Sequence, residues 1–195
     1  FNYKDNTLHR RIHRRMVATD TASWIEYEKF IQEHPDELSK LYQDLLISVT
    51  DFFRDKTAFD ELKRLITDII SQKNKGEEIR IWIAGCATGE EAYSIAILLR
   101  DLLGHELDDY HAQIFATDID TKALAIARKG KYEQAAIRGL TQTQLERHFT
   151  RVSDGYIVKK SLRDMVLFAK QNLTEDPAFL RLDLVTCRNV LIYMK

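Results

Sequence analysis

The stretch IWIAGCATGEEAYSIAILL, residues 81–99, decides the fold of this chain. It opens with an apolar, β-branched run that predicts a buried strand ending at Gly85. The small residues that follow, up to Gly89, predict a tight turn, and from Glu90 onward apolar side chains recur at helical spacing. Strand, bare turn and helix in this order are typical of a ligand-binding edge of a parallel sheet.

The same alternation of strands and helices continues on the C-terminal side. Further strands are predicted in AQIFATDID (112–120), MVLFAK (165–170) and DLVTC (183–187). Helices are predicted over Glu90–Leu103, Thr121–Lys129 and Leu140–Phe149, the last with the capping box Thr141-x-x-Gln144. Apolar strands that alternate with helices indicate an α/β fold with a parallel sheet.

Two other regions follow different patterns. The first 70 residues are helical throughout, and Leu8, Ile12 and Met16 form an apolar stripe among basic side chains. We therefore predict an N-terminal helical domain with its linker over residues 1–73 and an α/β domain over residues 74–195. The sequence VSDGYIVKK (152–160) predicts a hairpin that turns at Asp154-Gly155, and with it a small antiparallel β-subdomain around residues 150–170.

Composition excludes several classes of protein. The chain has 195 residues, is 45% hydrophobic and 30% charged, and carries a net charge of −1, so it has no overall attraction to nucleic acid. No apolar run reaches the ~20 residues of a bilayer span, which predicts no membrane insertion. Two cysteines form no disulfide framework and favour a cytoplasmic location. Neither CxxC nor HExxH occurs, so we expect no metal.

The two acids at the start of the helix indicate what the turn binds. A turn bare of side chains lets a ligand lie against main-chain N–H groups, but Glu90 and Glu91 would repel a pyrophosphate there. They would attract a ligand with cationic groups. S-adenosylmethionine has an adenosine, a sulfonium, an ammonium and no phosphate. The alternative is that both acids only stabilise the first helical turn against the helix dipole.

Asp118 ends the second strand and supports the same ligand. A carboxylate at this place can accept hydrogen bonds from both ribose hydroxyls. The alternative is that Asp118 caps the next helix, although Asp120 suits that role as well or better.

The chain resembles the CheR-type chemotaxis receptor methyltransferases, which use S-adenosylmethionine to methylate glutamate side chains on receptor helices. The matching blocks occur in the family's order and cover nearly the whole chain. They are SVTDFFRD (48–55), IWIAGCATGEEAYSIA (81–96), FATDIDTKALAIARKGKY (115–132), FAKQNL (168–173) and DLVTCRNVLIYM (183–194). The resemblance implies a Rossmann-like class I methyltransferase domain with a small antiparallel β-subdomain, preceded by an all-α domain.

The resemblance also assigns roles to individual residues. It implies that Arg188 and Tyr193 lie at the methyl-transfer centre and that S-adenosyl-L-homocysteine is the product. Cofactor contacts are implied for Ser48, Thr50, Arg54, Ala84, Gly85, Glu91, Asp118, Asn172, Leu173, Arg188 and Asn189. Ser48 stands where the family usually has asparagine, so a hydroxyl replaces a side-chain amide at that contact.

The basic helix near the N-terminus is the region that the family uses to contact receptors. The implied partners are cytoplasmic helices of methyl-accepting chemotaxis receptors, facing Arg10, Arg11, Arg14 and Arg15, with no role for nucleic acid. From charge alone, a solvated surface or a nucleic-acid site would explain these arginines equally well.

Other functions remain open at this point. A regulatory module could sense S-adenosylmethionine without transferring methyl, and the family normally continues with another helix and sheet-completing strands, which we expect to be missing from residues 74–195. An NAD-dependent dehydrogenase is disfavoured by Glu90 and Glu91. A nucleic-acid methyltransferase is disfavoured because CRNVLIY (187–193) stands where its acidic-aromatic tetrapeptide would be.

Overall fold

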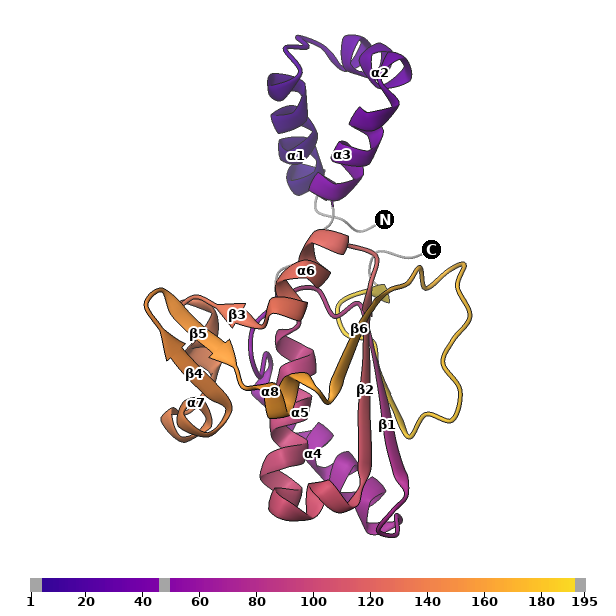
Figure 1. The fold of residues 1–195 in the computed structure, drawn as a ribbon. Coiled ribbons are helices and arrows are strands. Elements are labelled where there is room, and N and C mark those ends of the chain that lie inside the picture. Colours follow the sequence, from indigo (N-terminus) through magenta and orange to yellow (C-terminus); the bar gives the residue numbers. More distant parts are fainter. Residues whose placement is uncertain (1–4, 46–49, 192–195) are drawn as a thin grey trace. The chain divides into compact units, whose positions relative to one another are not determined.

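The computed structural model describes residues 5–45 and 50–191. Contacts within the chain divide it into two compact units, one made of Phe1–Ile47 with Asn189–Lys195 and the other of Ser48–Arg188. Figure 1 shows the elements of both units.

The smaller unit contains the helices α1 (Asp5–Ala18), α2 (Trp24–Glu33) and α3 (Pro35–Leu45). A partly buried ion pair lies among them. Arg15 donates two hydrogen bonds, of 2.8 and 2.6 Å, to the carboxylate of Glu37, and the Tyr27 hydroxyl donates a third at 2.9 Å. The bonds from Arg15 lower the pKa of Glu37, while burial raises the pKa of Tyr27 to about 12. This unit therefore uses one of its arginines to hold its helices together.

The larger unit is built on a four-stranded parallel sheet with the strand order β6-β2-β1-β7. Its strands are β1 (Glu78–Ala84), β2 (His111–Asp118), β6 (Val166–Lys170) and β7 (Leu184–Thr186). All three pairings are parallel. Since every strand runs the same way, all four carboxyl ends meet at one edge. The predicted α/β fold with a parallel sheet is confirmed.

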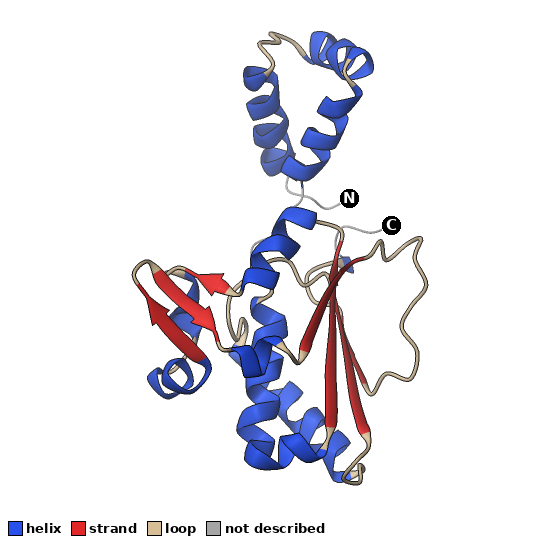
Figure 2. Ribbon diagram, in the orientation of Figure 1, coloured by secondary structure: helices blue, strands red, loops and turns tan. Residues whose placement is uncertain are grey.

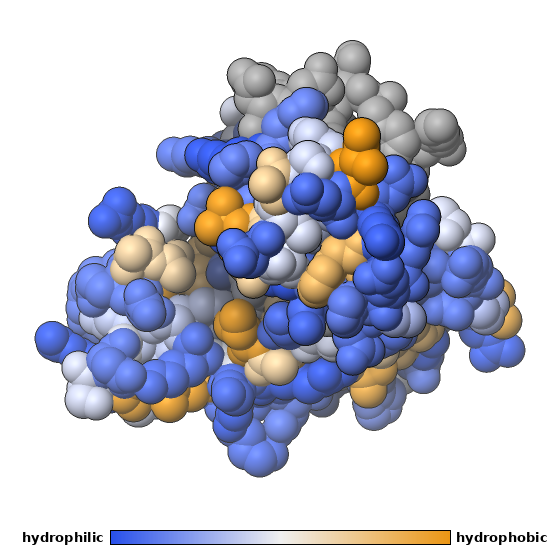
Figure 3. Space-filling model, turned by 90° about the horizontal axis from the view of Figure 1, so that it is seen from above, coloured by the Kyte–Doolittle hydropathy of each residue, from blue (hydrophilic) through white to orange (hydrophobic). Residues whose placement is uncertain are grey.

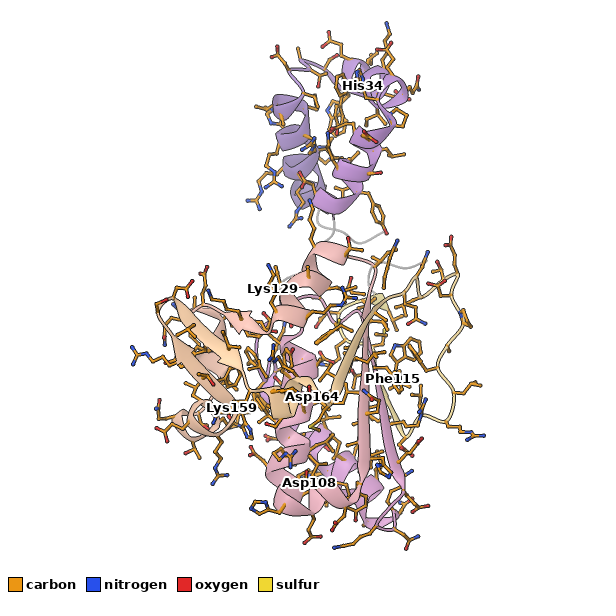
Figure 4. The ribbon with its side chains drawn as sticks, viewed as in Figure 1. His34, Asp108, Phe115, Lys129, Lys159 and Asp164 are labelled. Carbon is orange, nitrogen blue, oxygen red and sulfur yellow. The ribbon has the colours of Figure 1, made fainter. Side chains whose placement is uncertain are left out.

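Helices cover one face of this sheet (Figures 1 and 2). They are α4 (Lys56–Ser71), α5 (Glu90–Leu103), α6 (Thr121–Lys129) and α8 (Lys160–Arg163), and the 3₁₀ helix η1 (Gly104–Asp109) leads from α5 to β2. On the other face, the connection from β6 to β7 brings Phe179 against Phe115, with ring centroids 4.7 Å apart, and against Trp82. Figure 4 shows Phe115 on this side of the sheet.

Helix α4 belongs to the larger unit, which differs from the predicted domain boundary at residue 73. Its apolar stripe, Phe59, Leu62 and Ile66, is buried in one core with the inward-facing isoleucines of β1. Helical spacing alone could not show which apolar surface this stripe would cover, because periodicity contains no information about the partner.

A second, antiparallel sheet forms the β-subdomain. It consists of β3 (Lys131–Tyr132), β5 (Gly155–Val158) and β4 (Phe149–Val152), in the order β3-β5-β4, with η2 (Ala136–Gly139) and α7 (Gln142–His148) between β3 and β4. The capping box at Thr141 and the hairpin between β4 and β5 are confirmed. The turn consists of Ser153 and Asp154, one position before the predicted Asp154-Gly155, because Gly155 already pairs with Val152. The sheet spans residues 131–158 and not 150–170, because residues 166–170 pair with β2 in the main sheet.

Two general properties concern partners. Among the helices that the structure describes, none has the length and apolar character needed to cross a bilayer. On the face seen in Figure 3, most residues are hydrophilic and the hydrophobic ones lie in small, separate groups.

Candidate functional site

The turn between β1 and α5 is held in an unusual backbone conformation. Gly85, Ala87 and Gly89 have positive φ angles of 74°, 48° and 95°, and Ala87 adopts this conformation despite its side chain. Gly85 and Cys86 both donate from their main-chain N–H groups to the carbonyl of Thr117, at 2.8 and 2.9 Å. The turn is therefore fixed to the end of β2.

Two further N–H groups of the turn are also used inside the protein. Gly89 donates to the carbonyl of Cys86 at 2.9 Å, and Ala87 donates to a carboxylate oxygen of Asp118 at 2.7 Å. A pyrophosphate-binding turn must offer free N–H donors. These four groups are committed to protein acceptors, so they do not form a phosphate cradle.

Asp118 has two roles that its position at the end of β2 makes possible. One carboxylate oxygen accepts from Ala87 and the other from the N–H of Asp120 at 2.8 Å. Each oxygen has a second lone pair and can still accept from a ligand hydroxyl. Asp120 caps α6 by accepting from Lys122 and Ala123, which confirms the predicted cap. Asp118 therefore remains available as a ligand contact.

Glu91 and Arg188 join three distant parts of the chain. Thr186, at the end of β7, donates to one carboxylate oxygen of Glu91 at 2.8 Å, and Arg188 donates to the other at 3.3 Å. The same guanidinium donates to the carbonyl of Arg54 at 2.7 Å and lies 5.4 Å from the ring centroid of Phe59. The start of α5, the end of β7 and the segment before α4 thus meet at one point.

The neighbouring acid, Glu90, lies in a different environment. It is only 5% exposed and accepts from the hydroxyl of Thr88 at 2.6 Å. Burial raises its pKa. Gly89 beside it is also needed for packing, since a Cβ there would lie 2.8 Å from the Cβ of Ala127. Of the two acids that the sequence treats alike, only Glu91 contacts Arg188.

The segment after β6 approaches the site through the main chain. Gln171 is buried, and its N–H donates to the carbonyl of Asp118 at 3.1 Å. The side-chain oxygen of Asn172 accepts from the N–H and hydroxyl of Thr174, at 3.1 and 2.8 Å, so it shapes a tight turn. Asn172 and Leu173, both half-buried, are thereby held next to the end of β2.

The remaining predicted cofactor contacts are placed as follows. Ala84 is buried at the end of β1, Thr50 is half-buried and Arg54 is exposed. Asn189, with a φ of 56°, falls in the other unit. Ser48 and Tyr193 lie outside the described residues.

The arginines of α1 divide into two groups. Arg10 and Arg14 are exposed, and Arg14 pairs with Asp44 at 3.0 Å. Arg11 donates to the carbonyl of Asp44. Arg15 is engaged by buried Glu37, so its guanidinium is turned into the unit and not toward a partner.

Sequence reasoning missed Thr186 and Gln171, two buried polar residues at the ends of apolar strands. A polar side chain that closes an apolar run at the carboxyl edge is a signal that could have found both.

Both cysteines are free, and burial raises the pKa of each thiol. Within residues 5–45 and 50–191, no cluster of three metal-ligating side chains occurs.

Comparison with protein families gives two matches. A model described as CheR methyltransferase, SAM binding domain matches residues 48–195. A second, described as CheR methyltransferase, all-alpha domain, matches residues 1–46. The boundary between the two models lies at the same place as the division between the units at residues 47 and 48, whereas residues 189–195 match the first model and fall in the smaller unit.

Individual relatives extend this result. An uncharacterized 104.1 kDa protein of Rhodobacter capsulatus, from the hypE 3' region, is 39% identical over the whole chain, which covers 20% of that protein. A chemotaxis protein methyltransferase of Borreliella burgdorferi is 34% identical over 88% of the chain and 63% of its own length. Chemotaxis protein methyltransferase 1 of Pseudomonas aeruginosa is 33% identical over 94% of the chain and 69% of its own length. The chain thus spans less than two thirds of the first two relatives.

Proposed function

Since this chain belongs to the CheR methyltransferase family, we propose that it transfers a methyl group to the side-chain carboxylates of glutamate residues in chemotaxis receptors. Its cofactor is S-adenosyl-L-methionine, and its cofactor-binding domain covers residues 48–195. Two curated relatives carry the name chemotaxis protein methyltransferase, which supports the proposed substrate.

One observation carries the proposal: the site offers hydrogen-bond acceptors where a phosphate site would offer donors. Gly85, Cys86, Ala87 and Gly89 use their N–H groups within the protein, while the Asp118 carboxylate keeps lone pairs free. Ribose hydroxyls and an ammonium group are donors, and a pyrophosphate is an acceptor only. The Asp118 carboxylate therefore suits the ribose hydroxyls of S-adenosylmethionine, and these four N–H groups are not available to a pyrophosphate.

The proposed contacts follow from this arrangement. Asp118 accepts from the ribose hydroxyls, and Glu91 supplies negative charge beside the bare turn at Ala84 and Gly85. Asn172 and Leu173 flank the adenine. In the same proposal Ser48, Thr50, Arg54 and Asn189 contribute the contacts implied for their sequence blocks.

The chemistry requires positioning more than proton transfer. S-adenosylmethionine supplies an electrophilic methyl group. A glutamate side chain is already ionised at neutral pH, so its oxygen can form the new O–C bond as the S–C bond breaks, without a general base. Holding the two groups in line can supply about 7–11 kcal/mol of the barrier.

Arg188 and Tyr193 are the proposed positioning groups for the acceptor carboxylate. The guanidinium of Arg188 is fixed by Glu91 and by the carbonyl of Arg54. Its orientation can therefore restrict the acceptor carboxylate to one direction of approach. We expect Tyr193→Phe to lower kcat more than cofactor affinity. Equal losses in both would reject a positioning role for the phenol.

The proposed partners are cytoplasmic helices of methyl-accepting receptors. Arg10, Arg11 and Arg14 of α1 supply the receptor-facing charge. Arg15 supports this surface indirectly, because it orders α1 against α3 through Glu37. Charge of this kind contributes steering and specificity more than affinity.

The experiment combines binding with transfer. Calorimetry should show binding of S-adenosylhomocysteine and none of NAD. Incubation of the chain with receptor-containing membranes and methyl-labelled S-adenosylmethionine should then give base-labile label that is released as methanol, as expected of a methyl ester. Label that resists base would reject glutamate as the acceptor. Binding without transfer would favour the regulatory module instead.

A further inference from the structure

The charge of the chain is unevenly distributed. Residues 121–170 carry eleven lysines and arginines but only four aspartates and glutamates, although the whole chain has a net charge of −1. This segment comprises α6, the β-subdomain, α8 and β6. A local excess of cations on a neutral protein creates a positive surface potential that attracts acidic partners.

Two of these lysines lie on one face of α6, and a third lies at the end of β6, the strand that α6 contacts. Lys122 and Lys129 share a helix face with Ile126, which is 45% exposed. Lys170 pairs with Asp118 in the sheet register, so it lies at the carboxyl edge. Arg128 donates to the carbonyl of Phe168 at 2.9 Å and thereby fixes α6 to β6. We call Lys122, Ile126, Lys129 and Lys170 the α6 rim; Figure 4 labels Lys129 on it.

Among the residues that the structure describes, no acid forms an ion pair with the three lysines of the α6 rim, and all three lysines are exposed. Nearby lysines behave differently, since Lys131 pairs with Asp154 at 2.6 Å and Lys160 pairs with Asp164 at 2.5 Å. The rim therefore presents uncompensated charge around an exposed apolar side chain.

We propose that the α6 rim docks an acidic, amphipathic helical segment of the methylated receptor. The inference rests on the proposed function, which requires a glutamate to reach the carboxyl edge of the sheet. Lys122 follows Asp118 by only four residues, so a helix that delivers its glutamate to the site passes close to the rim. Neighbouring carboxylates would face the three lysines, and an apolar residue would cover Ile126.

This surface would also favour release of the product. Methylation converts one carboxylate into a neutral ester, so the modified segment has one negative charge less facing the rim. Electrostatic attraction to the lysines is then weaker for product than for substrate. The rim would thus bind the unmethylated segment in preference to the methylated one.

The test is the double variant Lys122→Gln/Lys129→Gln, with Lys63→Gln/Arg64→Gln as its control. Both pairs are exposed on helices, and both variants remove two positive charges. With a receptor fragment as substrate, the rim variant should lose about tenfold in kcat/KM at low salt, and the loss should vanish near about 0.5 M salt. The kcat and the Kd for S-adenosylhomocysteine should stay unchanged, and the control should behave as the parent chain.

A binding measurement separates this inference from the proposed function. The receptor fragment, and a copy with glutamines in place of its methyl-accepting glutamates, are titrated into both variants and the parent. The parent should prefer the glutamate form, and the rim variant should lose that preference. Absence of methyl transfer by the parent rejects the proposed function but leaves this comparison valid.

Three outcomes would overturn the proposal. The first is that the rim variant still prefers the glutamate form of the receptor fragment. The second is that the rim and control variants lose the same amount of kcat/KM. The third is that anionic lipid vesicles without receptor, or duplex DNA, bind the parent chain as well as the receptor fragment does.

Discussion

Replacing Asp118 with asparagine tests the assignment of the site most directly. Its two carboxylate oxygens accept from Ala87 and Asp120 at 2.7 and 2.8 Å. Asparagine has one acceptor oxygen, so its amide nitrogen would face an N–H group as a second donor. One of these two bonds is therefore lost, and the ligand hydroxyls lose a charged acceptor.

The two losses have different magnitudes. An unsatisfied, half-buried N–H destabilises the fold by about 1–2 kcal/mol. A hydrogen bond from a hydroxyl to a carboxylate contributes about 1.5–3 kcal/mol, which corresponds to about 10- to 150-fold in Kd. We therefore expect weaker binding of S-adenosylhomocysteine in a protein that remains folded.

Calorimetry and thermal unfolding measure the two effects separately. Asp120→Asn is the matched control: it also removes one carboxylate two residues away, and asparagine caps helices nearly as well as aspartate. The control should bind S-adenosylhomocysteine like the parent. An unchanged Kd for Asp118→Asn, or an equal loss in the control, would refute the assignment of Asp118 as a ligand contact.

Three predictions concern stability, each measured by urea or thermal unfolding. Glu37→Gln should cost about 2–4 kcal/mol at neutral pH, because it leaves Arg15 without its buried partner. The pKa of Glu37 in the folded protein lies below its ordinary 4.5, so this stabilisation is present above pH 4.5 and is lost as the pH falls through the folded pKa. The free energy of unfolding of the variant should therefore fall less steeply with acid than that of the parent, and an equally steep fall would contradict this explanation. Glu90→Gln should stabilise the protein at neutral pH by up to about 1 kcal/mol, since burial disfavours the ionised form, and a loss of stability would disprove this. Gly89→Ala should destabilise by about 2 kcal/mol or more, through strain at a φ of 95° and collision with Ala127, whereas Gly76→Ala, which meets no atom within 4 Å, isolates the backbone strain alone.

Local patterns in the sequence predicted the elements of the larger unit well. The helices Glu90–Leu103 and Thr121–Lys129 have the predicted bounds, because apolar spacing and the Asp120 cap act within a few residues. Because α5 begins and β2 ends at the carboxyl edge of the sheet, Glu91 and Asp118 both lie near the turn between β1 and α5. The resemblance then added Arg188, whose contact with Glu91 no local pattern could show.

What the sequence could not predict depends on partners far along the chain. Arg15 looks like its basic neighbours, but Glu37, 22 residues away, draws it into the unit. Glu90 and Glu91 are adjacent and chemically alike, and only packing separates a buried acid from one that meets a guanidinium. The N–H groups of the turn are similar: whether they are free depends on the carbonyl of Thr117 and on Asp118, which another strand supplies.

The contacts of Arg188 have a consequence for the order in which the protein matures. Ala87 and Asp118 are 31 positions apart, so the bare turn can close as soon as the second strand has left the ribosome. Arg188 reaches Glu91 across 97 positions and Arg54 across 134. The guanidinium thus arrives after both carboxylates, Glu91 and Asp118, and a nascent chain that already contains them cannot complete the junction until the residues after β7 have been synthesised.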